Sequence, residues 1–438
     1  MFKKILFFTI IIFCHISNLH AINLIRDAQT EAYLEKISSP IFKAANLDKQ
    51  IKLYIVNDEN INAFVAGGKN IFLNTGTIIK ANSPLSLIGI IAHETGHITG
   101  SHLARMSIDL KKINAQMALG YIIGMATLAS GQVDAGQAVI LGSSQIAERQ
   151  YYKHSIKHEE AADEAALKLL DQGQFSAKGL LNFFEQLKTT EKLNTEQLNP
   201  YTRTHPLTLD RINRIAKHLE TSPYSKKPST VADLAEFNLI KTKLKAFLED
   251  PLTIIKEADI TTENGKLAII IAKHRLGRSL EALELFSYLA AKNNPYMQEL
   301  KGQIEYESGI ATAAVKTLLA VEEQLPESAL IKIELAAAII SAQKQDLYNY
   351  AIAKLNQALI IEKENVSGWR NISRLYNLTA QTGLSLLALA EAEFFAANYL
   401  LAIKYATNAK KILTKSNNSA SILRAEDIIK FSKEQEDV

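Results

Sequence analysis

The spacing of apolar positions divides the chain into three zones. From residue 263 to residue 438, Ala, Leu, Ile and Lys dominate, and apolar residues recur with helical spacing almost throughout. Residues 22–218 alternate between helical and strand-like runs, whereas residues 219–262 are interrupted by breakers such as Pro223 and Pro251. The pattern therefore predicts an α+β domain, a connector and an all-α domain, which together make a mainly α protein.

Three short strand-like runs stand near the start of the α+β zone, after a predicted helix at about 28–47. The runs cover residues 51–56, 62–66 and 70–74, and a Gly-Gly pair separates the last two in the manner of a hairpin turn. Such a hairpin can be purely structural, or its edge strand can pair with the backbone of an extended peptide. The sequence leaves both interpretations open.

The next run predicts a single helix at about 85–105, with Ser83 as a favourable N-cap. His93 and His97 then lie one turn apart on the same helix face. Two neutral imidazoles at that spacing can bind one Zn²⁺ at about 2.0–2.1 Å, and Glu94 points to the side, where it can reach a water on the metal. This is the H-E-x-x-H arrangement of metalloproteases, which needs a third ligand to be convincing.

Acidic residues farther along the chain can supply that ligand. A second helix is predicted to open at His158 and to end near Gly173. Glu159 and Asp163 are four residues apart in it, so they share a face. Glu159 can complete a His₂Glu site, and Asp163 can accept the free imidazole N–H of a ligating histidine. Carboxylates also favour helix N-termini for electrostatic reasons alone, but their combination with the histidine pair favours the metal site.

These motifs, together with a Thr-His-Pro triplet at residues 204–206, resemble the zinc metallopeptidase family that includes HtpX and the CAAX prenyl protease. The resemblance covers about residues 60–211. It implies a zincin-type fold with one Zn²⁺ per chain and with Glu94 as the general base. The implied metal ligands are His93, His97 and Glu159. Ala161 and Ala166 depart from the family pattern, but neither is an expected ligand.

His205 is the least settled residue of the predicted site. The resemblance to periplasmic members of the family implies that His205 reaches the zinc and takes the position that water needs, which keeps the enzyme latent until the loop moves. The alternatives are a donor to the oxyanion during turnover and an ordinary loop histidine beside Pro206. Arg211, on the following helix, is expected to orient this loop or to pair with a carboxylate.

The all-α zone holds a weak internal repeat that resembles tetratricopeptide repeats. The unit around Ala314 fits best, with Gly302 twelve residues before it and Pro326 twelve after it. Small residues recur where the second helix of each unit would need them: Ala282, Ala314, Ala351 and Ala402. The unit at Ala351 needs about three inserted residues. Ala-rich helical hairpins of another kind are the alternative, and either would form a curved array that binds another protein.

Residues 113–147 are mostly apolar or small, and neither half is long enough to span a bilayer. Three interpretations remain open: a mobile lid beside the active site, a surface that contacts a membrane or an unfolded substrate, and a buried helical hairpin. His102 and His154 lie near the motifs and are expected to be surface residues or neighbours of the ligands rather than ligands.

Composition adds the cellular context. The chain has 438 residues and a formal charge of +3, which gives no reason to expect a nucleic-acid partner. Residues 1–21 have the features of an export signal, with an uncleaved anchor as the alternative. The only cysteine, Cys14, lies in that segment, so the mature chain would have no disulfide. We expect a periplasmic protein, for which peripheral attachment to the outer membrane stays open.

The resulting hypothesis is a zinc endopeptidase of the bacterial envelope that cleaves misfolded or stalled outer-membrane proteins and assists their assembly. Its repeats would dock on the outer-membrane assembly machinery, and residues 113–147 are a candidate for peripheral membrane contact. The rival is a repeat-based chaperone or scaffold with dormant proteolysis. A pseudo-enzyme with a structural zinc is disfavoured, because such a site does not require Glu94. Another divalent ion would fit the same ligands.

Overall fold

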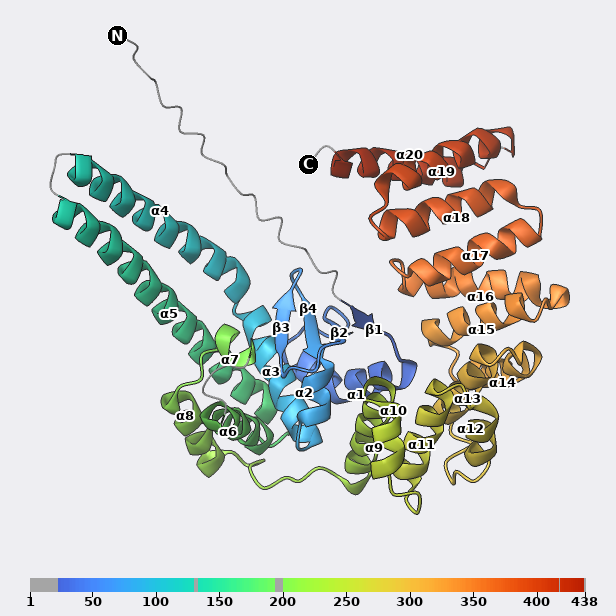
Figure 1. Ribbon diagram of the computed structural model, residues 1–438, viewed down its shortest axis with the longest axis horizontal. Helices are drawn as coiled ribbons and strands as arrows, with labels where there is room; N and C mark the ends of the chain where they lie inside the picture. The colour runs from blue at the N-terminus through green and yellow to red at the C-terminus, as the bar shows by residue number, and fades with distance from the viewer. Residues whose placement is uncertain (1–22, 130–132, 194–199, 417, 437–438) are drawn as a thin grey trace, which may run out of the picture.

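The computed structural model describes residues 23–129, 133–193, 200–416 and 418–436, so the predicted export signal at 1–21 and Cys14 lie outside the described residues. A small sheet and its surrounding helices form the N-terminal part, and a curved all-helical arm follows, as Figure 1 shows. The predicted mainly α fold is therefore confirmed. Within the described ranges, no helix is both long and apolar enough to cross a membrane.

The sheet has four strands in the order β1-β2-β4-β3. The strands are β1 (Leu24–Ile25), β2 (Lys52–Val56), β3 (Ala63–Ala66) and β4 (Asn70–Asn74). β3 and β4 form the predicted antiparallel hairpin, and both glycines of its turn, Gly67 and Gly68, have positive φ angles of 57° and 91°. β2 pairs with β4 in parallel, which leaves β3 at the edge. The two-residue β1 is too short to produce a periodic signal.

Three helices pack around this sheet: α1 (Ala28–Ala44), α2 (Thr75–Lys80) and α3 (Pro84–Thr99). The side chain of Ser83 caps α3 as predicted. The expected continuous helix at 85–105 is wrong, because α3 ends at Thr99 and the chain turns through Gly100 and Ser101, whose φ is 51°. The glycine that signals a helix end was present in the sequence at this point.

A long helical hairpin follows, made of α4 (His102–Ala129) and α5 (Val133–Gln172). Figure 1 shows that its outer part projects away from the rest of the molecule. The interpretation of residues 113–147 as a buried hairpin is wrong, because described apolar side chains such as Leu119, Ile122 and Leu141 are exposed. The predicted helix start at His158 is also wrong, because α5 runs through that position as one helix. Its end near Gly173 is confirmed.

Helices also fill the segment expected to be a connector. The N-terminal part closes with α6 (Lys178–Leu193), α7 (Pro200–Thr204) and α8 (Leu209–Thr221), and then come α9 (Val231–Leu248) and α10 (Pro251–Glu257). Pro251 begins α10 as its first residue, with Asp250 as the cap, so this breaker separates helices rather than marking an extended linker. α9 packs against α1 and α2 on one side and α11 on the other.

The described residues of the arm form ten α-helices and two short 3-10 turns. Their bounds are α11 (Glu263–Arg275), α12 (Ser279–Phe286), α13 (Pro295–Glu307), α14 (Ala311–Gln324), α15 (Ala329–Ser341), η1 (Gln345–Leu347), α16 (Tyr348–Ile361), α17 (Val366–Leu378), α18 (Thr382–Phe395), α19 (Tyr399–Leu413), η2 (Thr414–Ser416) and α20 (Ser419–Glu436). Successive helices pack as antiparallel neighbours in a curved stack (Figure 1).

The repeat alanines are buried at the helix contacts: Ala282, Ala314, Ala351 and Ala402. A Cβ at Gly302 would lie 2.7 Å from the Leu318 side chain, so this glycine lets α13 and α14 approach closely. The first three alanines lie in α12, α14 and α16, every second helix, but Ala402 lies in α19. The position of the small residue therefore shifts by one helix between Ala351 and Ala402. The three residues of η1 account for the insertion that the unit at Ala351 was expected to need.

Candidate metal centre

The centre is built on α3, which is apolar on nearly all sides and buried from Leu87 to His97. Its histidines and Glu94 are therefore isolated from bulk water in the interior of the N-terminal part. Helix α5 crosses α3 at Gly96, where a Cβ would lie 2.5 Å from the carbonyl oxygen of Ala162. This close approach brings the side chains of Glu159 and Asp163 to the histidine face of α3.

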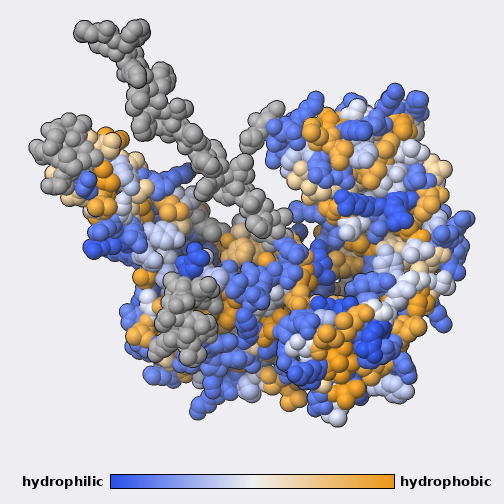
Figure 2. Space-filling view, viewed as in Figure 1, coloured by the Kyte–Doolittle hydropathy of each residue, from blue (hydrophilic) through white to orange (hydrophobic). Residues whose placement is uncertain are grey.

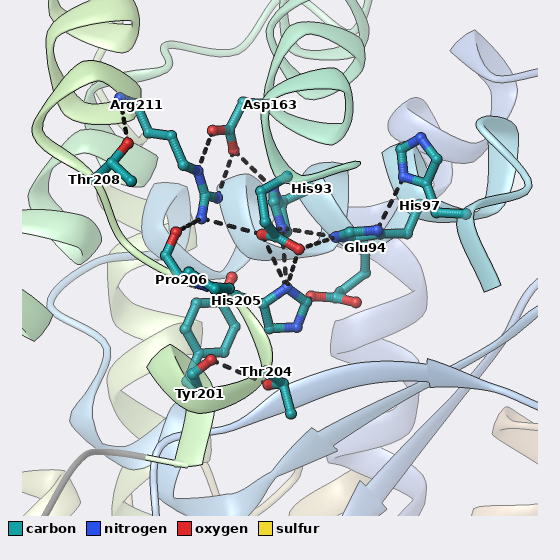
Figure 3. Close-up of polar contacts among 12 residues, drawn as sticks. His93, Glu94, His97, Asp163, Tyr201, Thr204, His205, Pro206, Thr208 and Arg211 are labelled. Carbon is teal, nitrogen blue, oxygen red and sulfur yellow. Dashed lines mark hydrogen bonds and ion pairs between the residues drawn. The ribbon is translucent and has the colours of Figure 1, made fainter. Parts of the chain in front are cut away.

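Four side chains converge there, from α3, α5 and the chain just after α7. Their potential ligand atoms all lie within 4.8 Å of one another: His93, His97, Glu159 and His205. Figure 3 shows His93, His97 and His205 gathered beside Glu94. All four side chains are largely or fully shielded from solvent.

The distances between these atoms fit a metal ion. His93 Nε2 lies 3.1 Å from His97 Nε2 and 3.3 Å from a carboxylate oxygen of Glu159. His205 Nδ1 lies 3.1 Å from Glu159 and 3.5 Å from His93 Nε2. Ligands at about 2.0–2.1 Å from a tetrahedral ion are separated from one another by about 3.3–3.4 Å. The chemistry and the spacing of the donor set therefore fit Zn²⁺ or a similar divalent ion.

The charge of the buried groups points the same way. Glu94, Glu159 and Asp163 bring three carboxylates, and Arg211 brings one guanidinium. Burial of unpaired charge is costly, so a divalent cation at this point balances the remaining charge. Burial alone would lower the pKa of His93, but its contacts with Asp163 and Glu159 raise that pKa to about 10. Metal binding to Nε2 must therefore release a proton.

Glu94 lies beside the cluster and differs from the other carboxylates. It is fully buried, and neither of its carboxylate oxygens has a hydrogen-bond partner among the described residues. One of these oxygens lies 3.7 Å from His205 Nε2. Buried carboxylates are normally hydrogen-bonded, so a hydrogen-bond donor that is not part of the chain is expected here. A water molecule between Glu94 and the cluster meets that need.

Asp163 and Arg211 form a support behind the ligands. Asp163 accepts a hydrogen bond from His93 Nδ1 at 2.9 Å, which leaves Nε2 for the cluster. The fully buried Arg211 donates to the same carboxylate at 2.6 and 2.9 Å. Burial raises the pKa of Asp163, but the hydrogen bonds from Arg211 and His93 outweigh it and lower the pKa below its usual value.

Arg211 performs both of its expected tasks. Besides pairing with Asp163, it donates to the carbonyl oxygen of Pro206 at 2.8 Å, and this bond holds the loop that follows His205. The ring of Tyr201 stacks on His205 at 4.5 Å, and the His205 amide donates to the Tyr201 carbonyl at 2.7 Å. The imidazole of His205 is thus fixed with Nδ1 toward Glu159 and Nε2 toward Glu94.

His102 is a site residue whose role sequence reasoning left unassigned. It is buried, and its Nδ1 lies 3.0 Å from Nδ1 of His97, on the side away from the cluster. Burial and the neighbouring His97 and His158 lower the pKa of His102 to about 4, so its ring is neutral and Nδ1 can accept a hydrogen bond from Nδ1–H of His97. A continuous helix would have placed His102 about 140° around the axis from His97. His154 is not part of the cluster, and its Nδ1 lies 3.2 Å from a carboxylate oxygen of Asp109.

Comparison with known proteins agrees with this geometry. Residues 28–219 match the profile described as Peptidase family M48. The chain is similar to the "Beta-barrel assembly-enhancing protease" of Escherichia coli O157:H7, at 23% identity over 360 residues, 79% of this chain and 72% of that protein. It is also similar to the "Putative beta-barrel assembly-enhancing protease" of Vibrio cholerae, at 25% identity over 224 residues, 51% and 45% of the two chains.

The predicted resemblance to a metallopeptidase family is thereby confirmed. Among solved structures, the human IFIT1 dimer with PPP-AAAA aligns at a TM-score of 0.31 and 12% identity, over 76% of this chain and 90% of that chain. An alignment at that TM-score carries no inference about this protein.

Proposed function

Since residues 28–219 match the profile of peptidase family M48, we propose that the protein is a zinc-dependent endopeptidase of the bacterial envelope. Its substrates are misfolded or stalled outer-membrane proteins, whose assembly it also assists. The names of its relatives, which are beta-barrel assembly-enhancing proteases, support this substrate class. The observation that carries the proposal is the convergence of His93, His97, Glu159 and His205 on one point beside the buried carboxylate of Glu94, which accepts no hydrogen bond from the described residues.

Each residue of the centre has a proposed role. His93, His97 and Glu159 hold one Zn²⁺, which when bound polarises the scissile carbonyl and lowers the pKa of water. Glu94 accepts a proton from the attacking water and delivers it to the leaving amine. Asp163 keeps His93 in the tautomer that presents Nε2.

The edge strand β3 is the proposed binding site for the substrate backbone. β3 packs against α3 and pairs only with β4 among the described strands. Its outer edge can therefore take up an extended segment by strand addition, which recognises backbone rather than sequence. Such recognition suits unfolded polypeptides of varied sequence.

His205 is proposed to be a fourth ligand that keeps the site closed at rest. Its Nδ1 is directed at the same point as the other donors, at 3.1 Å from Glu159. A zinc ion with four protein ligands has no open position for water or substrate. Displacement of the segment that carries Tyr201 and His205 would then open the site.

The all-helical arm is proposed to dock the enzyme on the outer-membrane assembly machinery. Its curved stack of helical hairpins is the kind of surface that repeat proteins use to bind other proteins. We place the domains at 22–218 and 263–438 and the protein in the periplasm, after removal of an export signal at 1–21. The closed state of His205 also supports the rival function, a scaffold whose proteolysis is dormant.

Metal removal and reconstitution test the proposed activity. The purified protein is treated with a chelator and then reloaded with Zn²⁺, and cleavage of a denatured outer-membrane protein is followed on a gel. We expect loss of cleavage after chelation and recovery with about one equivalent of Zn²⁺. Cleavage that persists in the metal-free protein would refute the metallopeptidase assignment.

A further inference from the structure

The outer half of the α4–α5 hairpin has small residues where a water-soluble hairpin has large ones. Gly120 faces Ser143 so closely that a Cβ on the glycine would lie 2.3 Å from the serine Cβ. Gly124 and Ala147 are buried, and Gly120 is half-buried. A hairpin in water normally buries its large apolar side chains between its helices. Close contact through small residues is instead typical of helices packed in lipid.

Five large apolar side chains described in this half are mostly exposed. Their exposed fractions are 58% for Leu119, 66% for Ile122, 59% for Met125, 65% for Leu141 and 57% for Ile146. In Figure 2 hydrophobic residues are visible along the projecting hairpin. A contiguous apolar surface of this kind on a projecting element marks an interaction site.

A group of basic residues, here called the basic collar, separates this apolar half from the body of the protein. The collar comprises exposed residues of both helices: Lys111, Lys112, Arg149 and Lys153, with the exposed Glu148 as an acidic residue among them. Between residues 113 and 147 the sequence carries a single charged residue, Asp134. Positive charge beside an apolar segment complements the anionic headgroups above the acyl chains of a bilayer.

We propose that the outer half of the α4–α5 hairpin inserts into one leaflet of an anionic phospholipid bilayer, with the basic collar at the headgroups. The 17 residues from Ile113 to Ala129 extend about 25 Å as a helix, against a hydrocarbon thickness of about 30 Å. The hairpin is therefore long enough to enter one leaflet when tilted. It is not a spanning element, in agreement with the lack of a membrane-spanning helix among the described residues.

The charge favours a bilayer over a second copy of the chain as the occupant. Two copies that paired through these hairpins would bring two basic collars together, and like charges at close range repel. The proposal does not depend on peptidase activity. Because α4 begins at His102, insertion would hold the metal centre at the root of the hairpin, near the membrane surface.

Vesicle co-sedimentation of the full mature chain tests the proposal. The probes are phosphatidylcholine vesicles with and without phosphatidylglycerol, and the variant combines Ile122→Gln with Leu141→Gln. Both side chains are exposed, so glutamine should not disturb folding. The matched control combines Ile360→Gln with Leu252→Gln, which are exposed to 71% and 65% in other parts of the chain. We expect binding to anionic vesicles to fall roughly tenfold or more in the hairpin variant only.

Replacement of the basic collar gives a second readout. Lys111→Gln with Lys112→Gln should weaken binding to anionic vesicles, by roughly fivefold for each lysine, and leave the weak binding to neutral vesicles unchanged. Equal loss in the hairpin variant and its control would overturn the proposal. So would an absence of vesicle binding by the wild-type chain, or self-association that the hairpin substitutions abolish without any vesicle binding.

Discussion

Nδ1 of His102 lies 3.0 Å from Nδ1 of His97, although α3 and α4 are separate helices with a turn between them. The turn at Gly100 and Ser101 folds α4 back far enough for this contact. His97 Nε2 faces the metal position, so its Nδ1 carries the hydrogen and donates a hydrogen bond to Nδ1 of His102. His102 therefore fixes the tautomer and the ring orientation of His97, as Asp163 does for His93.

Replacement of His102 by alanine should weaken metal binding. The loss of the acceptor frees the His97 ring to rotate and to change tautomer, and partners of this kind typically contribute 10–100-fold to metal affinity. Competition with a chromogenic chelator measures the affinity. His154→Ala is the control, because His154 contacts Asp109 and none of the four converging residues. Equal affinity of the two variants would show that His102 has no positioning role.

Removal of the Arg211 guanidinium should destabilise the fold. Arg211→Met leaves the buried Asp163 carboxylate without its main partner, and breaking a buried pair in this way costs about 3–5 kcal/mol. Arg214→Met is the matched control, because Arg214 is half exposed and pairs with Glu160 on the surface. Its expected cost is about 0–1 kcal/mol. Chemical denaturation of both variants measures the difference, and similar midpoints would contradict the structure.

Substitution of His205 by alanine separates its three interpretations. If His205 closes the site as a fourth ligand, His205→Ala should raise cleavage of a denatured protein severalfold, because a coordination position opens. A large fall in kcat would instead identify an oxyanion donor, and an unchanged rate would identify an ordinary loop histidine. Arg203→Ala, at an exposed position of the neighbouring helix α7, controls for loosening of the segment.

The junction between the N-terminal part and the arm should be sensitive to acid. Asp27 lies 2.5 Å from the buried Lys243, which also pairs with Glu299 of α13. Burial raises the pKa of Asp27, but Lys243 and Thr30 outweigh it and lower the pKa below its usual value of about 3.9.

A carboxylate with a lowered pKa in the folded state stabilises the fold above its unfolded pKa, and this contribution is lost as pH falls through the folded value. Asp27→Asn keeps a capping side chain on α1 but removes the charge. The variant should therefore be less stable than wild type at pH 7, and the gap should shrink below about pH 4. Thermal melts across this pH range measure the difference in stability between the two proteins. A difference that does not change with pH would contradict the lowered pKa of Asp27.

Local spacing made the centre of the site predictable. The pairs His93/His97 and Glu159/Asp163 each depend only on the i,i+4 geometry of a helix, which the sequence specifies without knowledge of the fold. The edge hairpin was predictable for a similar reason, because Gly67 and Gly68 mark its turn.

Features set by tertiary packing were not predictable. The end of α3 depends on how α4 folds back, so His102 appeared to face away from His97. The start of α5 lies far before His158, because packing against α4 continues a helix through a polar stretch that offers no periodic signal. The exposed position of the α4–α5 hairpin also depends on what surrounds it, and apolar composition alone suits either burial or exposure.

The most direct test of the account compares wild type with Glu94→Gln. Glutamine keeps the size of the side chain but cannot accept the proton of the attacking water, whereas the four residues around the metal position are unchanged. The account predicts one bound Zn²⁺ per chain in both proteins and a loss of cleavage of a denatured outer-membrane protein by at least about 100-fold in the variant. Wild-type cleavage by Glu94→Gln would contradict it.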